Sequence, residues 1–330
     1  MQAYNRKYGH SNKLHRVMGF SFDHLPFNTL VGADSATFAR ATEHFRAECG
    51  YRQRYMLTRL CNKALNCLYR ANQRRYISLP KPEIISPVFI IGHWRSGTTY
   101  LHNLLCRDPQ FGYCTTYQTV FPHLMLYGSS LFKTLARICM PASRPADHLA
   151  LSVNQPQEEE FALSNMTHAA FYHFWIFPQR FEHYRDRYLF FDTATDAEVN
   201  EFCNALRTLI HICLHCQNKG RFLSKNPPHT ARIQLLLSMF PDAKFIYIHR
   251  REQDVIRSTK NFFRQTLSAL TLQSFSEDKL DCQIVNTYHA LIDRYKRDRL
   301  LISPSNLCEI SFENLIANTD NTLDYIYRRL

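Results

Sequence analysis

Val88-Phe-Ile-Ile91 and the residues that follow, Gly92-His-Trp-Arg-Ser-Gly97-Thr98-Thr99, decide the fold of this chain. Four consecutive apolar residues are typical of a strand buried in a parallel sheet. Beyond the loop, Leu101, Leu104 and Leu105 recur with the period of a helix. The spacing Gly-x-x-x-x-Gly between a strand and a helix lets backbone amides and the positive end of the helix converge on one anion. The segment therefore predicts a phosphate-binding loop of the P-loop type.

The loop departs from the version that serves phosphoryl transfer from nucleoside triphosphates. Thr98 stands where that version has its lysine, and Arg95, inside the loop, supplies a positive charge instead. The apolar segment 244–249 is followed by Arg250 and Arg251 rather than by an aspartate that would hold magnesium. Because phosphoryl transfer relies on that metal, the sequence argues against ATP hydrolysis and predicts a phosphate site without a metal ion.

Short apolar segments alternate with helical patterns over residues 86–330. Strands are expected at 88–91, 222–223, 244–249 and 307–312, and helices after the loop and at 157–170, 195–217, 229–239 and 252–264. Alternation of this kind is typical of a parallel α/β sheet with helices on both faces.

The residues before this region have a different pattern. Residues 1–33 show weak periodicity, and Asp34 or Ser35 is suited to cap a helix. Apolar side chains then recur at three- and four-residue steps, which predicts one long helix or two shorter ones over 35–75; they are Leu57, Leu60, Cys61, Ala64, Leu65 and Leu68. Prolines within 80–87 end helical structure. We therefore expect a helical N-terminal extension, 1–85, and a domain over 86–330.

The charge of the chain indicates an anionic partner. Its 330 residues include 40 Lys and Arg against 28 Asp and Glu, a net charge of +12. Such a balance fits a nucleotide, a nucleic acid or an acidic membrane surface. No apolar stretch approaches the roughly 18 residues that a transmembrane helix needs. The first residues carry charge with no apolar segment behind them, so we expect no secretory signal and a cytoplasmic location.

The 11 cysteines are scattered and odd in number, and without an export signal we do not expect them to form disulfides. The densest group, His211-Ile-Cys-Leu-His-Cys216, resembles a metal motif. It lies on a predicted helix with an apolar stripe, however, and no second Cys-x-x-Cys completes a zinc site. We expect ordinary buried cysteines there and no metal ion.

Several segments together resemble the sulfotransferases that depend on 3′-phosphoadenosine 5′-phosphosulfate (PAPS). Arg95-Ser-Gly-Thr-Thr99 is similar to their 5′-phosphosulfate loop, and Arg250 with Ser258, eight positions later, is similar to the pair that binds the 3′-phosphate. Leu223-Ser-Lys225-Asn-Pro-Pro-His229 is similar to the strand–lysine–helix unit of the family. Gln155-Pro-Gln-Glu158-Glu159-Glu160 resembles an acidic motif of bacterial-type members. The resemblance covers about residues 86–320.

This resemblance implies an α/β fold with a central parallel sheet flanked by helices, like that of the P-loop nucleoside triphosphate hydrolases. It implies that the sulfuryl group of PAPS, as co-substrate and without a metal, moves to a hydroxyl or amine of an acceptor. It also implies contacts to the nucleotide from Arg95, Ser96, Gly97, Thr98, Thr99, Tyr100, Arg250 and Ser258. In this scheme Tyr100 stacks on the adenine.

Two catalytic roles follow from the same resemblance. Lys225 would offset the charge that grows on the bridging oxygen, and pre-placed charge of that kind is often the largest catalytic contribution. A base must also take the proton of the acceptor. His229 suits this task near neutral pH, and a glutamate of the run Glu158–Glu160 suits it where burial raises its basicity. The sequence leaves these two alternatives open.

The acceptor is not specified by the sequence. Ala169-Ala-Phe-Tyr-His-Phe-Trp-Ile-Phe177 either lines an apolar pocket for a steroid, lipid or phenol or belongs to the core. We expect a small-molecule or lipid acceptor, peripheral membrane contact at most, and no nucleic acid. Two other functions are compatible with parts of the sequence: a P-loop nucleotide phosphotransferase, and a basic nucleic-acid-binding protein without catalysis. The first lacks its lysine and aspartate, and the second lacks a recognition motif.

Overall fold

A computed structural model describes residues 28–43, 47–139 and 152–330. Residues 1–27 of the expected N-terminal extension lie outside the described residues. Five parallel strands form one sheet in the order β2-β3-β1-β4-β5. They are β1 (Val88–Ile91), β2 (Phe111–Gly112), β3 (Arg221–Lys225), β4 (Lys244–His249) and β5 (Leu307–Ser311). The predicted parallel sheet is confirmed, and β2 is an edge strand that the sequence did not reveal.

Helices follow or precede each strand. They are α2 (Ser35–Thr42), α3 (Arg52–Ile77), α4 (Thr98–Leu105), α5 (Thr116–Val120), α6 (Ser129–Cys139), α7 (Glu159–Met166), α8 (Phe181–Tyr184), α9 (Asp196–Gln217), α10 (Ile233–Met239), α11 (Glu252–Leu270), α12 (Glu277–Asp298), α13 (Phe312–Ala317) and α14 (Thr319–Tyr327). Within the described ranges, no helix is long and apolar enough to cross a bilayer.

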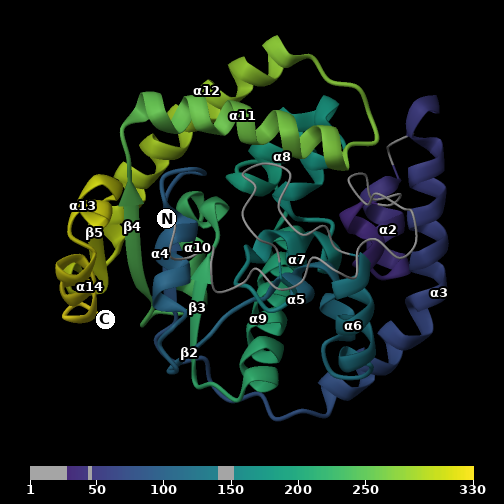
Figure 1. The fold of residues 1–330 in the computed structure, drawn as a ribbon, viewed down its shortest axis with the longest axis horizontal. Coiled ribbons are helices and arrows are strands. Elements are labelled where there is room, and N and C mark those ends of the chain that lie inside the picture. Colours follow the sequence, from purple (N-terminus) through teal and green to yellow (C-terminus); the bar gives the residue numbers. More distant parts are fainter. Residues whose placement is uncertain (1–27, 44–46, 140–151) are drawn as a thin grey trace.

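The two faces of the sheet belong to two different hydrophobic clusters. Val88 and Ile90 of β1 pack with residues of α4, α13 and α14, whereas Phe89 and Ile91 pack with residues of α9, α10, α11 and α12. Successive side chains of a strand point to opposite faces, so a strand covered on both faces must be apolar throughout. This explains the uninterrupted apolar segment from which the sheet was predicted, and Figure 1 shows helices on both sides of the strands.

The N-terminal region forms two helices, α2 and α3, rather than one. Asp34 caps α2, since its carboxylate accepts a hydrogen bond from the Thr37 N–H at 2.7 Å. Helix α3 runs along the outer edge of the molecule, on the side away from β5 (Figure 1). The division at 85/86 stays a prediction.

Candidate active site

The loop between β1 and α4 has a backbone that its glycines permit. Gly92 and Gly97 have φ of 146° and 104°, a region that side chains disfavour. A Cβ on Gly92 would lie 2.4 Å from the carbonyl oxygen of Ile248 in β4, and one on Gly97 would lie 2.3 Å from the Phe312 ring. The two glycines therefore permit the tight turn between strand and helix, and the binding of an anion by this loop stays a prediction.

Residues from distant segments hold this loop in place. The Thr230 hydroxyl accepts a hydrogen bond from the Gly92 N–H at 2.8 Å, and the Thr259 hydroxyl of α11 donates to the Trp94 carbonyl at 3.3 Å. Within the described residues, the hydroxyl oxygen of Ser96 is buried without a hydrogen-bond partner. A buried polar atom of this kind calls for a partner, and a phosphate oxygen in the loop would provide one.

Arg95 and Ser258, 163 residues apart, are in direct contact. The Arg95 Nε donates a hydrogen bond to the Ser258 Oγ of α11 at 2.9 Å. The Arg95 guanidinium also lies over the Phe262 ring, 5.6 Å from its centroid. The two segments that the sequence predicts to bind the 5′- and 3′-phosphates are thus in direct contact.

Arg250 lies beside the same loop, directly after β4. Its guanidinium is 4.8 Å from the centroid of Phe312, the ring that limits the space at Gly97. Asp254 holds it loosely, at 3.9 Å, and the side chain is 29% exposed. Tyr100 is 41% exposed on the first turn of α4. Both side chains are therefore accessible at the surface on which the loop opens.

Lys225 ends β3 next to β1, where it pairs with Ile90. Its side chain is fully buried, and Nζ lies 2.8 Å from the Glu158 carboxylate. A buried ammonium needs such a partner, because its desolvation is otherwise very costly. The strand carries Lys225 to the carboxyl edge of the sheet, the edge at which open α/β sheets bind ligands.

Each of the three consecutive glutamates contacts the end of β3. Glu158 binds Lys225 Nζ. Glu159 accepts hydrogen bonds from the Lys225 N–H at 3.2 Å and the Ser224 hydroxyl at 3.1 Å. Glu160 accepts one from the Asn226 amide at 2.8 Å and two from Arg232, at 2.7 and 2.8 Å. The acidic run therefore positions the end of β3.

Burial and neighbouring charges affect the candidate bases to different extents. Burial raises the pKa of the Glu159 carboxyl to about 7. Burial also opposes ionisation of Glu160, but the charge and hydrogen bonds of Arg232, together with the hydrogen bond from Asn226, hold the pKa of that carboxyl below its usual value. Burial, together with the charge of Arg232, lowers the pKa of His229 to about 3. His229 is fully buried, whereas Glu158 retains a small exposure of 9%. The two candidate bases thus differ in access to an acceptor.

A hydrogen-bonded chain that the sequence did not reveal joins the loop to this cluster. The Trp94 Nε1 donates to the Tyr172 hydroxyl at 2.7 Å, and that hydroxyl donates to Glu158. Glu158 in turn binds Lys225. Trp94 precedes Arg95 directly, so the anion loop and the lysine are coupled through two aromatic side chains. Nothing in the local sequence distinguishes Tyr172 from the other aromatic residues of its segment.

Of two other groups singled out from the sequence, the aromatic segment lies in the core, whereas the histidine and cysteine group of α9 is buried only in part. The segment 169–177 is buried throughout, so these aromatic residues fill the interior. On α9, Cys213 is buried as expected, and its thiol lies 3.6 Å from the Gln118 amide oxygen. The expectation was wrong for Cys216, which is exposed and whose thiol contacts the Met125 carbonyl at 3.5 Å. In the described ranges, no three His, Cys, Asp or Glu residues gather as a candidate metal site.

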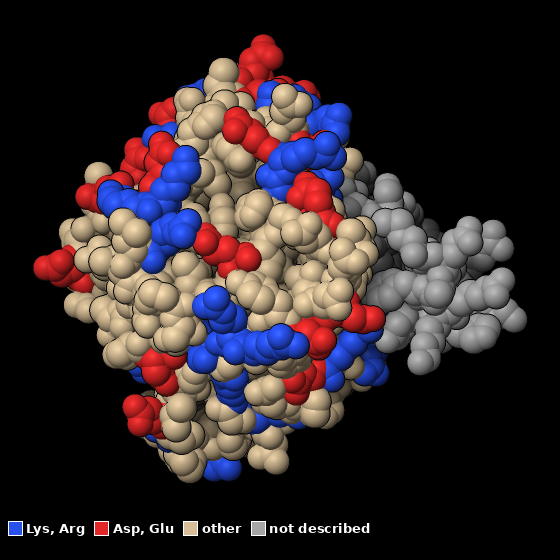
Figure 2. All heavy atoms as spheres, turned by 90° about the vertical axis from the view of Figure 1, so that its left-hand side faces the viewer, with Lys and Arg blue, Asp and Glu red and all other residues tan. Residues whose placement is uncertain are grey.

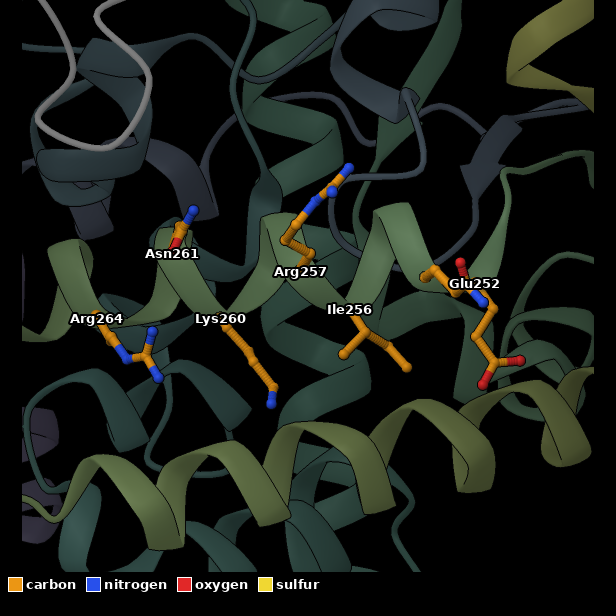
Figure 3. A pocket seen from close by; sticks show the side chains of 7 residues that line it. Glu252, Ile256, Arg257, Lys260, Asn261 and Arg264 are labelled. Atoms are coloured by element: carbon orange, nitrogen blue, oxygen red, sulfur yellow. The ribbon is translucent and has the colours of Figure 1, made fainter.

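A hollow of about 420 Å³ lies along α11. Figure 3 shows Lys260 and Arg264 pointing toward α12, and Arg257 pointing away from it. Asp281 lies 3.0 Å from Lys260 and 2.8 Å from Arg264. None of the predicted nucleotide-binding residues lines this hollow. With its inward-facing cations already paired, it does not compete with the loop as a phosphate site.

The comparison with protein families identifies the chain. A model described as the sulfotransferase family matches residues 87–330. The chain belongs to the sulfotransferase family. The match begins at the strand that precedes the anion loop and includes the acidic run, Lys225 and the Arg250–Ser258 pair.

Two curated relatives are also sulfotransferases. The omega-hydroxy-beta-dihydromenaquinone-9 sulfotransferase Stf3 of Mycobacterium bovis is 32% identical over 244 residues, 74% of this chain and 62% of that protein. The protein of the same name from Mycobacterium tuberculosis matches equally. The match therefore spans less than two thirds of the length of these relatives.

Two solved structures have the same fold. Sulfotransferase STF1 from Mycobacterium tuberculosis superposes with a TM-score of 0.66 at 19% identity, over 89% of this chain and 80% of that one. Sulfotransferase STF9 from Mycobacterium avium superposes with a TM-score of 0.67 at 18% identity, over 90% and 79%. These likenesses confirm the fold of this family member.

Proposed function

We propose that this chain transfers the sulfuryl group of PAPS to a hydroxyl group of a hydrophobic acceptor, without a metal ion. The observation that carries the proposal is the contact between Arg95 and Ser258 at 2.9 Å, beside the buried Lys225–Glu158 pair. A nucleotide that carries phosphates at its 3′ and 5′ positions fits the contact between Arg95 and Ser258. An ammonium held close to a carboxylate fits proton transfer and charge stabilisation at one centre.

We propose that different residues bind the two phosphates and the adenine of the nucleotide. The amides of the loop, Ser96 to Thr99, and the Arg95 guanidinium would hold the 5′-phosphate. Ser258 and Arg250 would bind the 3′-phosphate by charge-assisted hydrogen bonds. The exposed Tyr100 would stack on the adenine. The orphaned Ser96 hydroxyl supports this assignment, since it is a buried donor at the place where a phosphate oxygen is expected.

We propose Glu158 as the general base. Of the candidates, it alone combines partial exposure with direct contact to Lys225. The Glu160 carboxylate forms an ion pair with Arg232, and His229 is fully buried in the core. In the transfer, the acceptor O–H proton passes to the Glu158 carboxylate while the acceptor oxygen bonds to sulfur. The bond from sulfur to the bridging oxygen breaks, and Lys225 offsets the charge that remains on 3′,5′-ADP.

The acceptor that we propose is a lipid alcohol. The name of the matched relative describes a sulfotransferase of a hydroxylated menaquinone derivative. We also propose a cytoplasmic location, because the free and buried Cys114, Cys213 and Cys308 suit a reducing compartment.

A transfer assay tests the proposed activity. The full chain is incubated with radiolabelled PAPS and a long-chain primary alcohol, a phenol or a short alcohol, with and without EDTA. We expect label on the long-chain alcohol, with and without EDTA. Glu158→Gln should lose the activity, and His229→Asn should keep it in a folded protein. Phosphate transfer from ATP with magnesium, in place of sulfuryl transfer, would favour a phosphotransferase.

A further inference from the structure

Helix α3 has its polar and apolar faces reversed relative to an ordinary surface helix. The residues that it buries include Thr58, Asn62 and Asn72, while Met56, Leu60 and Leu68 are 56, 65 and 43% exposed. A surface helix normally turns its apolar stripe to the core and its polar side to water. Of the apolar residues from which the helix was predicted, Cys61 and Leu65 are half-buried, whereas Leu57, Leu60, Ala64 and Leu68 are exposed. The exposed ones therefore have a different purpose from core packing.

Hydrogen bonds to the backbone fix α3 in this orientation. Thr58 accepts a hydrogen bond from the Asn28 N–H at 3.1 Å, and the Tyr69 hydroxyl donates to the Val31 carbonyl at 3.0 Å. Asn72 accepts from the Tyr127 N–H at 2.7 Å. Rotation of the helix to bury the apolar stripe would break these bonds and leave buried polar groups unpaired. The outward stripe is thus a built feature of the fold.

Positive charge accompanies the stripe. Helix α3 contains seven basic residues and no acidic one; they are Arg52, Arg54, Arg59, Lys63, Arg70, Arg74 and Arg75. Arg52, Arg59, Lys63 and Arg70 follow one another at intervals of seven, four and seven residues, which places them in one row along the helix. All four are exposed, and among the described residues no carboxylate forms an ion pair with any of them.

The basic row borders the apolar stripe. At 100° per residue, Met56, Leu60 and Cys67 project beside the row, and Ala64, Leu57 and Leu68 lie farther round the same exposed side. By contrast, Figure 2 shows basic and acidic side chains interspersed on the face formed around β5, α13 and α14. A helix with an apolar stripe, a basic border and low overall hydrophobicity is the type that lies in a membrane interface.

We propose that α3 docks on the surface of an anionic lipid bilayer, with its stripe (Met56, Leu57, Leu60, Ala64, Cys67 and Leu68) among the acyl chains and its basic row on the headgroups. Charge complementarity favours an anionic bilayer as the partner, because basic residues are attracted to anionic lipids. Long basic side chains can also reach the headgroups from an apolar surface. Docking would place a sulfotransferase of lipid alcohols next to its acceptor.

Flotation with vesicles tests the proposal on the full chain, without PAPS or acceptor, so its failure and that of the proposed function are separate outcomes. Vesicles contain phosphatidylcholine alone or mixed with phosphatidylglycerol. We expect binding to the mixed vesicles that weakens as salt is added. The combined change Arg59→Gln, Lys63→Gln and Arg70→Gln should lower the affinity by about 100-fold. Leu57→Gln with Leu60→Gln should also abolish binding.

Matched changes on α12 and its end control for general loss of charge or hydrophobicity. Lys279→Gln with Lys296→Gln, and Leu300→Gln with Leu301→Gln, alter exposed residues and should leave vesicle binding unchanged. Circular dichroism shows that each variant is folded. Equal binding to neutral vesicles, no binding to anionic ones, or binding that the α3 changes do not weaken would overturn the proposal.

Cysteine labelling identifies what covers the stripe. Cys67 on α3 and Cys282 on α12 are both exposed, so a maleimide should modify both in the free protein, as peptide mass spectrometry would report. Anionic vesicles should protect Cys67 and leave Cys282 reactive. If Cys67 is unreactive without vesicles, either another part of the chain or a second copy covers the stripe, and the proposal is wrong. Sedimentation velocity separates these two outcomes.

Discussion

Arg95 of the anion loop donates a hydrogen bond to Ser258 of α11 at 2.9 Å, across 163 residues of sequence. Arg95 has a φ of 67°, a conformation that most side chains avoid. The loop therefore holds an unfavourable backbone conformation while its side chain contacts the helix that follows β4. This contact brings the two predicted phosphate motifs side by side.

The first prediction concerns this pair. Arg95→Ala and Ser258→Ala should each weaken binding of 3′,5′-ADP, and their effects should not add, because each removes the same contact. We expect a coupling energy of about 0.5 to 3 kcal/mol in a double-mutant cycle measured by calorimetry. Additive losses would mean that the two side chains act separately on the nucleotide.

The second prediction concerns Lys225. Lys225→Ala should lower kcat by ~100- to 1,000-fold with little change in nucleotide affinity, because its charge matters most when the bridging oxygen becomes negative. Lys219→Ala is the control, since Lys219 is a half-buried lysine just before the same strand whose ammonium donates to the Pro109 carbonyl rather than to the acidic cluster. A folded Lys225→Ala variant with wild-type turnover would show that the catalytic centre lies elsewhere.

The third prediction concerns the hydrogen bonds through which Tyr172 joins Trp94 of the loop to Glu158. Tyr172→Phe removes the hydroxyl that contacts both Trp94 and Glu158, so kcat should fall while KM for PAPS changes less. Tyr117→Phe is its matched control, because the Tyr117 hydroxyl donates to the Leu124 carbonyl in another cluster. Both variants should lose about 1 kcal/mol of stability. Equal turnover in the two variants would leave Tyr172 with a structural role alone.

The fourth prediction concerns pH. Burial raises the pKa of Glu159 from 4.5 to about 7, so the folded protein keeps a proton that the unfolded chain has lost. Its contribution to stability is fully present below about pH 4.5 and is lost as the pH rises through about 7. Glu159→Gln should therefore become more stable relative to the wild type between about pH 5 and about pH 8.

Thermal denaturation of both proteins over this range measures that difference, and subtraction removes the titration of other groups. Glu160→Gln serves as the comparison. Arg232 holds the pKa of Glu160 below its usual value against the opposing effect of burial, so its stability difference from the wild type should stay constant over the same range. A constant difference for Glu159→Gln as well would contradict a neutral Glu159 in the folded protein.

The sequence was sufficient to predict the central strands of the sheet and the turn that follows β1. Strands buried on both faces leave an uninterrupted apolar signature, as in 88–91 and 244–249, and the Gly92–Gly97 spacing specifies a turn that glycines alone permit. Both strands have the predicted bounds. The edge strand β2, only two residues long, has no comparable signature. Helix α11 continues to Leu270, past its predicted end at 264, because no proline or glycine stops it.

The internal arrangement of the site could not be predicted. Glu158, Glu159 and Glu160 resemble a solvated helix start in sequence, yet the end of β3 and Arg232 bury and bind them. Only the fold brings these partners within reach, 65 to 72 positions apart along the chain. Likewise, the apolar stripe of α3 predicts a helix correctly, but its outward orientation depends on polar contacts with residues 28–33 and 126–127.

The proposed function depends on recognition of a 3′-phosphorylated nucleotide, which calorimetry measures directly. We predict that the wild-type chain binds 3′,5′-ADP about 10- to 100-fold more tightly than 5′-AMP, because Arg250 and Ser258 contribute charge-assisted contacts to the 3′-phosphate. Arg250→Ala should remove this preference, and Arg251→Ala, at a neighbouring side chain that is 79% exposed, should keep it. Equal affinity of the wild-type chain for the two nucleotides would contradict the account.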